Sequence, residues 1–140
     1  MRVVADCSIV VASALGETIS DLVGVFERLL RRPELEILVP SIWPSEVANA
    51  LLMAERKGRI SNTSRQDSLA RCFQCLPTIE PPPTEADLHR ITALAVRHRL
   101  TIYDALYVDL AVRTNSVLAS LDDAMLRAAR TEGVAVLGDP

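Results

Sequence analysis

The segment ELEILVPSIWPSEVANALLMAERKG, Glu34 to Gly58, sets the pattern for the whole chain. Its first part, Glu34–Pro40, is a short apolar run that ends at a proline and is typical of a buried strand. Its second part, Pro44–Lys57, is typical of a helix, with a proline in the first turn and Gly58 placed to end it. The segment therefore predicts a strand that leads directly into a helix, which is the repeating unit of α/β domains.

The same alternation continues along the rest of the chain. Further strands are expected at Arg2–Asp6, 76–80, Ser116–Leu121 and 134–138. Further helices are expected at Ile19–Arg32, from Ser61 or Asn62 to about Cys75, from Thr84 to about Arg99, from Thr101 through ALYVDLAVR, and from Asp122 to Arg130. Thr84 with Asp87, and Thr101 with Asp104, match the capping box of a helix start. Alternating strands and helices predict one α/β domain over residues 1–140, with a mainly parallel sheet and right-handed crossovers.

The composition indicates an aliphatic core, because hydrophobic residues make up 49% of the chain and aromatic residues only 4%. No apolar run reaches the roughly 18 residues that a membrane span needs. The N-terminal apolar run contains the charged Asp6, which argues against a signal peptide, so we expect a cytoplasmic protein. The net charge of −3 argues against a large, sequence-independent nucleic-acid surface, but it leaves room for a nuclease whose acids surround metal ions.

Three cysteines, Cys7, Cys72 and Cys75, suit a reducing compartment better than a disulfide scaffold. Cys72 and Cys75 form a C-x-x-C, but this motif ends an expected helix, whereas a redox motif would lie where a strand enters a helix. A zinc site would need a second pair of ligands, and neither His89 nor His98 has a matching spacing. We therefore interpret all three cysteines as small buried side chains.

Four acids, Asp6, Glu46, Asp104 and Asp122, occupy junctions between the expected elements. Asp6 and Asp122 each follow a strand, and Glu46 lies in the first turn of a helix after a strand. Sites in open parallel sheets form beyond the carboxyl ends of the strands, where these three acids are expected. Asp104 opens a helix, so the fold must bring it close to the others.

Capping is the simpler interpretation of such acids taken singly, above all for Asp104 and Asp122. An acid at a helix N-terminus accepts a free backbone N–H group and meets the positive end of the helix dipole, which stabilises by about 0.5–1 kcal/mol. Asp6 fits this interpretation less well, because Ser8 could serve as the cap. The choice between capping and a site therefore stays open for the single residues.

Glu46 fits simple capping least well. The only polar residues between Trp43 and Ala54 are Ser45, Glu46 and Asn49, and their spacing places them on one helical stripe. A narrow polar stripe on an apolar helix suggests that it lines a cavity. If the four acids converge, their carboxylates would repel one another, and a hard divalent cation such as Mg²⁺ or Mn²⁺ would relieve that repulsion. Together, metal and acids can activate water to hydrolyse a phosphodiester.

Four stretches carry a family resemblance in this order: VVADCS, PSIWPSEVANALL, RLTIYDALYVDLA and LASLDDAMLRAA. Together they resemble the PIN-domain family, and more closely its VapC branch, the toxins of type II toxin–antitoxin systems. The resemblance spans nearly the whole chain. It implies a three-layer α/β/α sandwich with a central, mainly parallel sheet of about five strands. It also implies a Mg²⁺- or Mn²⁺-dependent endoribonuclease, a hydrolase.

The resemblance also implies roles for single residues. Asp6, Glu46, Asp104 and Asp122 match the acidic quartet of the family. All four would belong to the metal site: Asp6 and Asp104 would hold the metal, directly or through water, while Glu46 and Asp122 would orient metal-bound water and complete the negative pocket. The supporting positions that match are Ser8, Asn49 and Ser120.

Asp122 and Asp123 are adjacent, so either could be the fourth acid. We favour Asp122 because Ser120 precedes it at the spacing of the family. A residue directly after the strand also points more readily over the sheet edge. Asp123 would then be a first-turn partner of the helix dipole.

Partners follow from the same resemblance: an RNA substrate, a small antitoxin whose tail covers the acidic cleft, often with an arginine, and a second copy of the chain in a homodimer. Aliphatic residues of Ile19–Arg32 and Asn62–Cys75 are candidates for these contacts, although some of them must pack on the sheet. The alternative is a non-catalytic PIN-like interaction module whose acids only cap helices. A response-regulator receiver would need a lysine late in the chain, and the only lysine is Lys57.

Overall fold

The computed structural model describes residues 1–140 and has a parallel sheet of four strands at its centre. The strands are β1 (Arg2–Ala5), β2 (Glu36–Val39), β3 (Thr78–Ile79) and β4 (Val117–Ala119), in the spatial order β3-β2-β1-β4. Val3 of β1 pairs with Ile37 of β2 on one side and with Val117 of β4 on the other. After their exposed first residues, β1 and β2 are apolar and buried, as expected for parallel strands that are covered on both faces.

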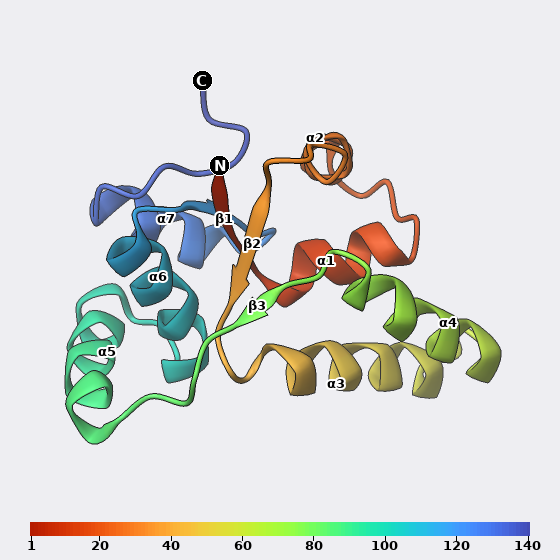
Figure 1. Ribbon diagram of the computed structural model, residues 1–140. Coiled ribbons are helices and arrows are strands. Elements are labelled where there is room, and N and C mark those ends of the chain that lie inside the picture. Colours follow the sequence, from red (N-terminus) through yellow and green to blue (C-terminus); the bar gives the residue numbers. More distant parts are fainter.

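Seven helices cover the two faces of this sheet: α1 (Cys7–Ala14), α2 (Asp21–Leu29), α3 (Trp43–Arg56), α4 (Asn62–Phe73), α5 (Glu85–His98), α6 (Ile102–Thr114) and α7 (Asp123–Thr131). Figure 1 shows α1 to α4 on one side of the sheet and α5 to α7 on the other. These three layers confirm the predicted α/β/α sandwich. None of the helices is long and apolar enough to cross a membrane.

One predicted strand is reduced to a single contact. Residues 134–138 were expected to add a fifth strand, but they make only one bridge, between Val136 and Leu118. Gly133 and Gly138 have positive φ angles of 78° and 94°, so the chain turns at both ends of this segment. Too few extended residues remain between the two turns to build a longer ladder.

The helix α1 was not among the predicted elements. Four successive residues from Ile9 to Ala12 are apolar, so the sequence shows no stripe with a helical period. In the structure Ile9, Val10 and Ala12 are buried, and α1 contacts α2, α3 and α4. A helix that is covered on most sides needs no polar face, which explains why its pattern is uninformative.

Buried aromatic side chains anchor the two helices that carry Glu46 and Asp104. Trp43 lies in the first turn of α3 and Tyr107 in the second turn of α6, and both are fully buried. Trp43 packs edge-on against Phe73 of α4, with ring centroids 5.1 Å apart. The N-terminal ends of α3 and α6 are therefore held by packing rather than by exposed polar contacts alone.

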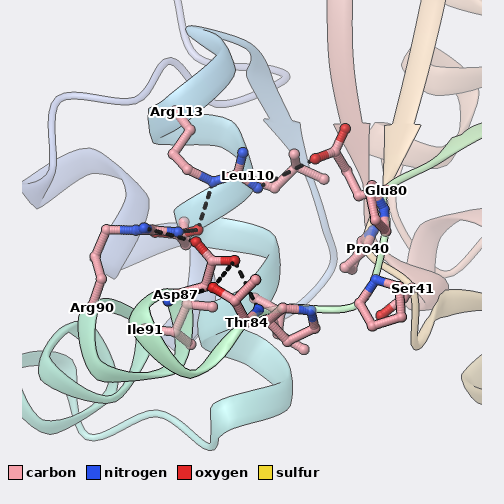
Figure 2. A pocket seen from close by; sticks show the side chains of 14 residues that line it. Pro40, Ser41, Glu80, Thr84, Asp87, Arg90, Ile91, Leu110 and Arg113 are labelled. Atoms are coloured by element: carbon pink, nitrogen blue, oxygen red, sulfur yellow. Dashed lines mark hydrogen bonds and ion pairs between the residues drawn. The ribbon is translucent and has the colours of Figure 1, made fainter.

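A buried ion-pair network joins α5 to α6. The side chain of Asp109 on α6 is only 4% exposed and binds two arginines. Arg90 of α5 donates to both of its carboxylate oxygens, at 2.7 and 3.1 Å, and Arg113 donates to one of them at 2.8 Å. Figure 2 shows Arg90 and Arg113 on the wall of the adjoining cavity, and Arg113 also reaches Glu80 at 3.5 Å. Sequence patterns did not reveal this pairing.

We predict that Arg90→Met lowers the free energy of unfolding by about 3 kcal/mol, because it leaves a buried carboxylate with only one of its arginines. Urea unfolding of the full chain measures the loss. Arg97→Met is the matched control on the same helix, since Arg97 is 55% exposed and its pair with Glu132 should contribute less than about 1 kcal/mol. Equal losses in the two variants would show that the Asp109 network does not stabilise the fold.

Candidate functional site

The strand order creates a topological switch point beside β1. From β1 the chain crosses to β2 on one side, whereas β4 arrives on the other side after the crossover from β3. In open parallel sheets this switch in direction leaves a crevice beyond the carboxyl ends of the strands, where ligands bind. Asp6 directly follows β1, and Ser120 directly follows β4. The site expected from the sequence therefore begins at the switch point.

Asp6 lies at this switch point and is only 6% exposed. One of its oxygens, Oδ2, accepts hydrogen bonds from the hydroxyls of Ser8 at 2.6 Å and Ser120 at 2.8 Å. Burial raises the pKa of Asp6 above its usual range, and these two hydroxyls offset the rise only in part. Asp6 precedes α1 but accepts no capping hydrogen bond, and Ser8 binds Asp6 and the backbone N–H of Leu121 instead of capping the helix.

Glu46, in the first turn of α3, points inward and meets a residue that sequence analysis did not include. The hydroxyl of Tyr107 on α6 donates to Oε1 of Glu46 at 2.6 Å. Burial raises the pKa of Glu46, repulsion by Asp6 and Asp104 raises it further, and the Tyr107 hydrogen bond lowers it in part. The available signal was the spacing of Tyr107 from Asp104, since residues three apart share one face of a helix.

Ser45 and Asn49 do not share the inward orientation of Glu46. Both are exposed, while Val47 and Leu51 are buried on the opposite side of α3. Glu46 lies at the border between these two sides. The stripe expected to line a cavity is therefore mainly a solvent-facing one, and a part for Asn49 in the site stays a prediction.

Asp104 differs from an ordinary capping acid, as a comparison with Asp87 at the start of α5 shows. At the start of α5 the capping box is complete: Thr84 accepts from the backbone of Asp87, and the Asp87 carboxylate accepts from the backbone N–H of Thr84 at 2.9 Å. At the start of α6 only half of the predicted box forms, with Thr101 accepting from the backbone of Asp104 at 3.1 Å. The Asp104 carboxylate is not used to close the box.

The environment of Asp104 connects it to the other acids. Burial raises the pKa of Asp104, and repulsion by Asp122 and by Asp6 adds to the rise. Asp6 in turn raises the pKa of Glu46. The four acids predicted from the sequence thus form one electrostatically coupled group at the carboxyl edge of the sheet, which we call the acid cluster.

Asp122 and Asp123 lie in different surroundings. Asp122 is the N-cap of α7, and its Oδ1 accepts from the backbone N–H of Met125 at 2.8 Å, so the capping interpretation is correct for this oxygen. Asp122 also repels Asp104, which places its charge beside the acid cluster. Asp123 instead acts on Arg130, whose pKa is raised mainly by a hydrogen bond to Asp139 and to a lesser degree by Asp123.

No basic side chain neutralises the acid cluster. Neither lysine nor arginine is among the groups that shift the pKa values of Asp6, Glu46 and Asp104. Carboxylate and hydroxyl oxygens are the donors that Mg²⁺ and Mn²⁺ prefer. No three Asp, Glu, His or Cys side chains are arranged to hold one ion together. An ion bound here would therefore take at most one or two of these carboxylates as direct ligands and would have to keep most of its waters, as Mg²⁺ usually does.

The cavity in Figure 2, of about 200 Å³, is separate from the acid cluster. It lies between α5, α6 and the proline run 81–83, and none of the four acids of the cluster lines it. Its charged groups, Arg90, Arg113, Asp87, Asp109 and Glu80, already pair with one another. The cavity therefore belongs to the structural network of Asp109, and we do not place the chemistry there.

The cysteines are free; Cys7 and Cys72 are buried as predicted, whereas Cys75 is only partly buried. Burial raises the pKa of both Cys72 and Cys75 to about 11, so both remain thiols at neutral pH. Low-pKa thiolates are what redox chemistry requires. The interpretation of the C-x-x-C as packing rather than as a reactive motif is consistent with this state.

Comparison with known proteins identifies the family to which this chain is similar. The PIN domain family model matches residues 3–131. Exonuclease VapC9 of Pyrobaculum aerophilum is 32% identical over 73% of this chain and 71% of its own length. Ribonuclease VapC3 of the same organism is 28% identical over 87% of this chain and 90% of its own length.

Solved structures agree on the fold. The crystal structure of PAE2754 from Pyrobaculum aerophilum superposes with a TM-score of 0.71 at 24% identity, covering 98% of this chain and 92% of the other. The strand order, the three layers and the family match therefore lead to one conclusion: this chain belongs to the PIN-domain family.

Proposed function

We propose that the chain is a Mg²⁺- or Mn²⁺-dependent endoribonuclease that acts as the toxin of a toxin–antitoxin pair. The observation that carries the proposal is the acid cluster, in which three carboxylates with raised pKa values meet at the switch point without a neutralising base. Neighbouring carboxylates repel one another and favour protonation, and a divalent cation would relieve that repulsion while keeping them ionised. The names of the VapC9 and VapC3 relatives, an exonuclease and a ribonuclease, support a nuclease.

The proposed chemistry divides the acids into two pairs. Asp6 and Asp104 would hold the cation, directly or through water, and Ser8 and Ser120 keep the Asp6 carboxylate in one orientation. A bound Mg²⁺ or Mn²⁺ supplies Lewis acidity, which activates water and stabilises the leaving oxygen of a phosphodiester. Glu46 and Asp122 would complete the negative pocket around the cation and orient the water bound to it.

The capping alternative explains only one of the four acids. Asp122 accepts a backbone hydrogen bond at a helix start, as that hypothesis requires. Asp6 accepts no capping bond, Glu46 accepts from a tyrosine hydroxyl, and Asp104 leaves its capping box half formed. A protein whose acids served only as caps would not need Asp6 to be buried, nor Asp6, Glu46 and Asp104 to lie close enough to raise one another's pKa values.

The proposed antitoxin would bind to the negative charge of the acid cluster. An antitoxin that presents an arginine would supply the positive charge that the acid cluster lacks, so inhibition and metal binding would compete for one place. Of the aliphatic residues considered for such contacts, Val23 and Leu29 are buried in the core, while Ile19 is 69% exposed. The homodimer and its interface stay predictions.

We expect Asp6→Asn, Glu46→Gln and Asp104→Asn each to lower RNA cleavage at least about 100-fold. The reason is that even partners outside a ligand sphere are worth about 10–100-fold in metalloenzymes. The assay uses a circular RNA with Mn²⁺, because only an endonuclease can open a circle. Glu85→Gln on α5 is the matched control, since this acid is 92% exposed and remote from the cluster. Full activity in all three variants would contradict the proposal.

Glu46→Gln should not lower thermal stability. Glutamine can still accept the Tyr107 hydrogen bond, and it removes the repulsion by Asp6 and Asp104. A large loss of folding with full RNA cleavage would instead identify Glu46 as a structural acid of α3.

We expect Mn²⁺ to stabilise the antitoxin-free protein and EDTA to reverse the effect. At a concentration of about 100 times Kd, binding to the folded state alone adds about 2.7 kcal/mol, which is worth about 10 °C in Tm for a domain of this size. Thermal unfolding measures the shift. Asp104→Asn should lose most of it, and Glu85→Gln should keep it. A wild-type Tm that does not respond to Mn²⁺ would count against a metal site.

Comparing Asp122→Asn with Asp123→Asn tests which acid belongs to the cluster. Asparagine caps a helix about as well as aspartate, so Asp122→Asn removes charge while keeping the cap of α7. We expect it to lower cleavage about 10-fold or more at nearly unchanged stability, while Asp123→Asn stays close to wild type. The reverse result in the cleavage assay would assign the role to Asp123.

A further inference from the structure

We propose that Tyr107 is a positioning residue that holds one oxygen of Glu46 and thereby leaves the other oxygen directed toward the cation of the acid cluster. The inference rests on the proposed function, because it assigns Tyr107 to the same metal site. Its basis is the 2.6 Å hydrogen bond from the Tyr107 hydroxyl to Oε1 of Glu46. Tyr107 itself would touch neither metal nor RNA.

The position of Tyr107 suits this role because the hydrogen bond connects two layers of the molecule. Glu46 belongs to α3, and Tyr107 belongs to α6 on the other side of the sheet, 61 residues later in the chain (Figure 1). Tyr107 is fully buried, so packing fixes its hydroxyl. Asp104 lies three residues earlier on α6, and such residues share one helix face. One face of α6 therefore supplies the acid Asp104 and also Tyr107, the group that holds the second acid, Glu46, near Asp104.

The chemistry of the donor also fits. A tyrosine hydroxyl is neutral at physiological pH and donates one hydrogen bond, which here goes to Oε1 of Glu46. An arginine could provide the same hydrogen bond, but its positive charge would compete with the cation. A neutral hydroxyl orders the carboxylate and leaves the negative field in place.

Without this hydrogen bond, Glu46 would have more freedom than the other acids. Its side chain is longer than that of aspartate and only half-buried, and no other side-chain hydrogen bond restrains it. Ordering such a side chain at the moment of metal binding opposes binding through lost rotamer entropy. Tyr107 removes this opposing contribution in advance, as preorganised partners of metal ligands do.

The test compares Tyr107→Phe with Tyr103→Phe in the purified full-length chain. Each change removes one hydroxyl oxygen from α6, but Tyr103 is 57% exposed and makes no side-chain hydrogen bond in the structure. We expect Tyr107→Phe to raise the Kd for Mn²⁺ about 10-fold, measured by calorimetry and by the Mn²⁺ concentration needed to raise Tm. For RNA cleavage, kcat at limiting Mn²⁺ should fall, KM should change little, and added Mn²⁺ should restore kcat. Tyr103→Phe should match the wild type in each measurement.

A double-variant cycle separates positioning from a merely structural role. If Tyr107 acts through Glu46, then Glu46→Gln and the combination Glu46→Gln/Tyr107→Phe should have the same Kd for Mn²⁺, since the carboxylate to be positioned is already gone. Losses that add in the combined variant, or a Tyr107→Phe protein that binds Mn²⁺ like the wild type, would overturn the inference while leaving the proposed function intact. A wild-type chain that binds no Mn²⁺ and cleaves no RNA would instead overturn the proposed function.

Discussion

The hydrogen bonds from Ser8 and Ser120 to the buried carboxylate of Asp6 join the two strand ends at the switch point. The backbone N–H of Asp6 also donates to Ala119 at 2.9 Å, so β1 and β4 stay paired up to the point where both leave the sheet. Ser120 continues the connection by accepting from the backbone N–H of Asp122 at 3.0 Å. A single oxygen of Asp6 thus fixes the orientation of its own carboxylate and, through Ser120, the turn that carries Asp122. Because the hydroxyls are neutral, this ordering does not discharge the site.

The two most buried acids of the protein, Asp109 and Asp6, have opposite kinds of partner. Asp109 is surrounded by Arg90 and Arg113, and its charge is fully paired inside the α5–α6 network. Asp6 is equally buried, yet its hydrogen-bond partners are two serines, and burial leaves its pKa raised. A paired buried acid serves packing, whereas an unpaired one lowers stability and is kept only where its charge is used. The contrast within one chain supports a functional interpretation of the acid cluster more directly than the presence of acids does.

The sequence predicted what depends on local pattern, and it missed what depends on pairing across the fold. Proline and glycine placement and capping residues located α3 and α5, and the order of the four acids was enough to place them at the carboxyl edge. The hydrogen bond between Tyr107 and Glu46 could not be predicted, because nothing in either segment specifies that the fold brings this part of α6 beside the start of α3. The strand predicted at 134–138 did not form because of a local feature of the sequence: glycines at both ends of this segment turn the chain. Ser45 and Asn49 were grouped with Glu46 because helical spacing cannot locate the border between the buried and exposed sides within about one residue.

Capping and metal binding, first treated as alternatives, have a common origin in this fold. In a parallel sheet each crossover helix begins near the edge where its strand ends, so helix N-termini and strand carboxyl ends gather on one side. Asp6 precedes α1, Glu46 lies in the first turn of α3, Asp104 in the first turn of α6, and Asp122 caps α7. Four helix starts thus direct the positive ends of their dipoles toward the acid cluster, which favours ionised carboxylates without introducing a lysine or arginine. The fold can therefore offset part of the repulsion between these acids without a basic side chain, and Asp122 shows that one carboxylate can cap a helix with one oxygen and still act on a neighbouring acid.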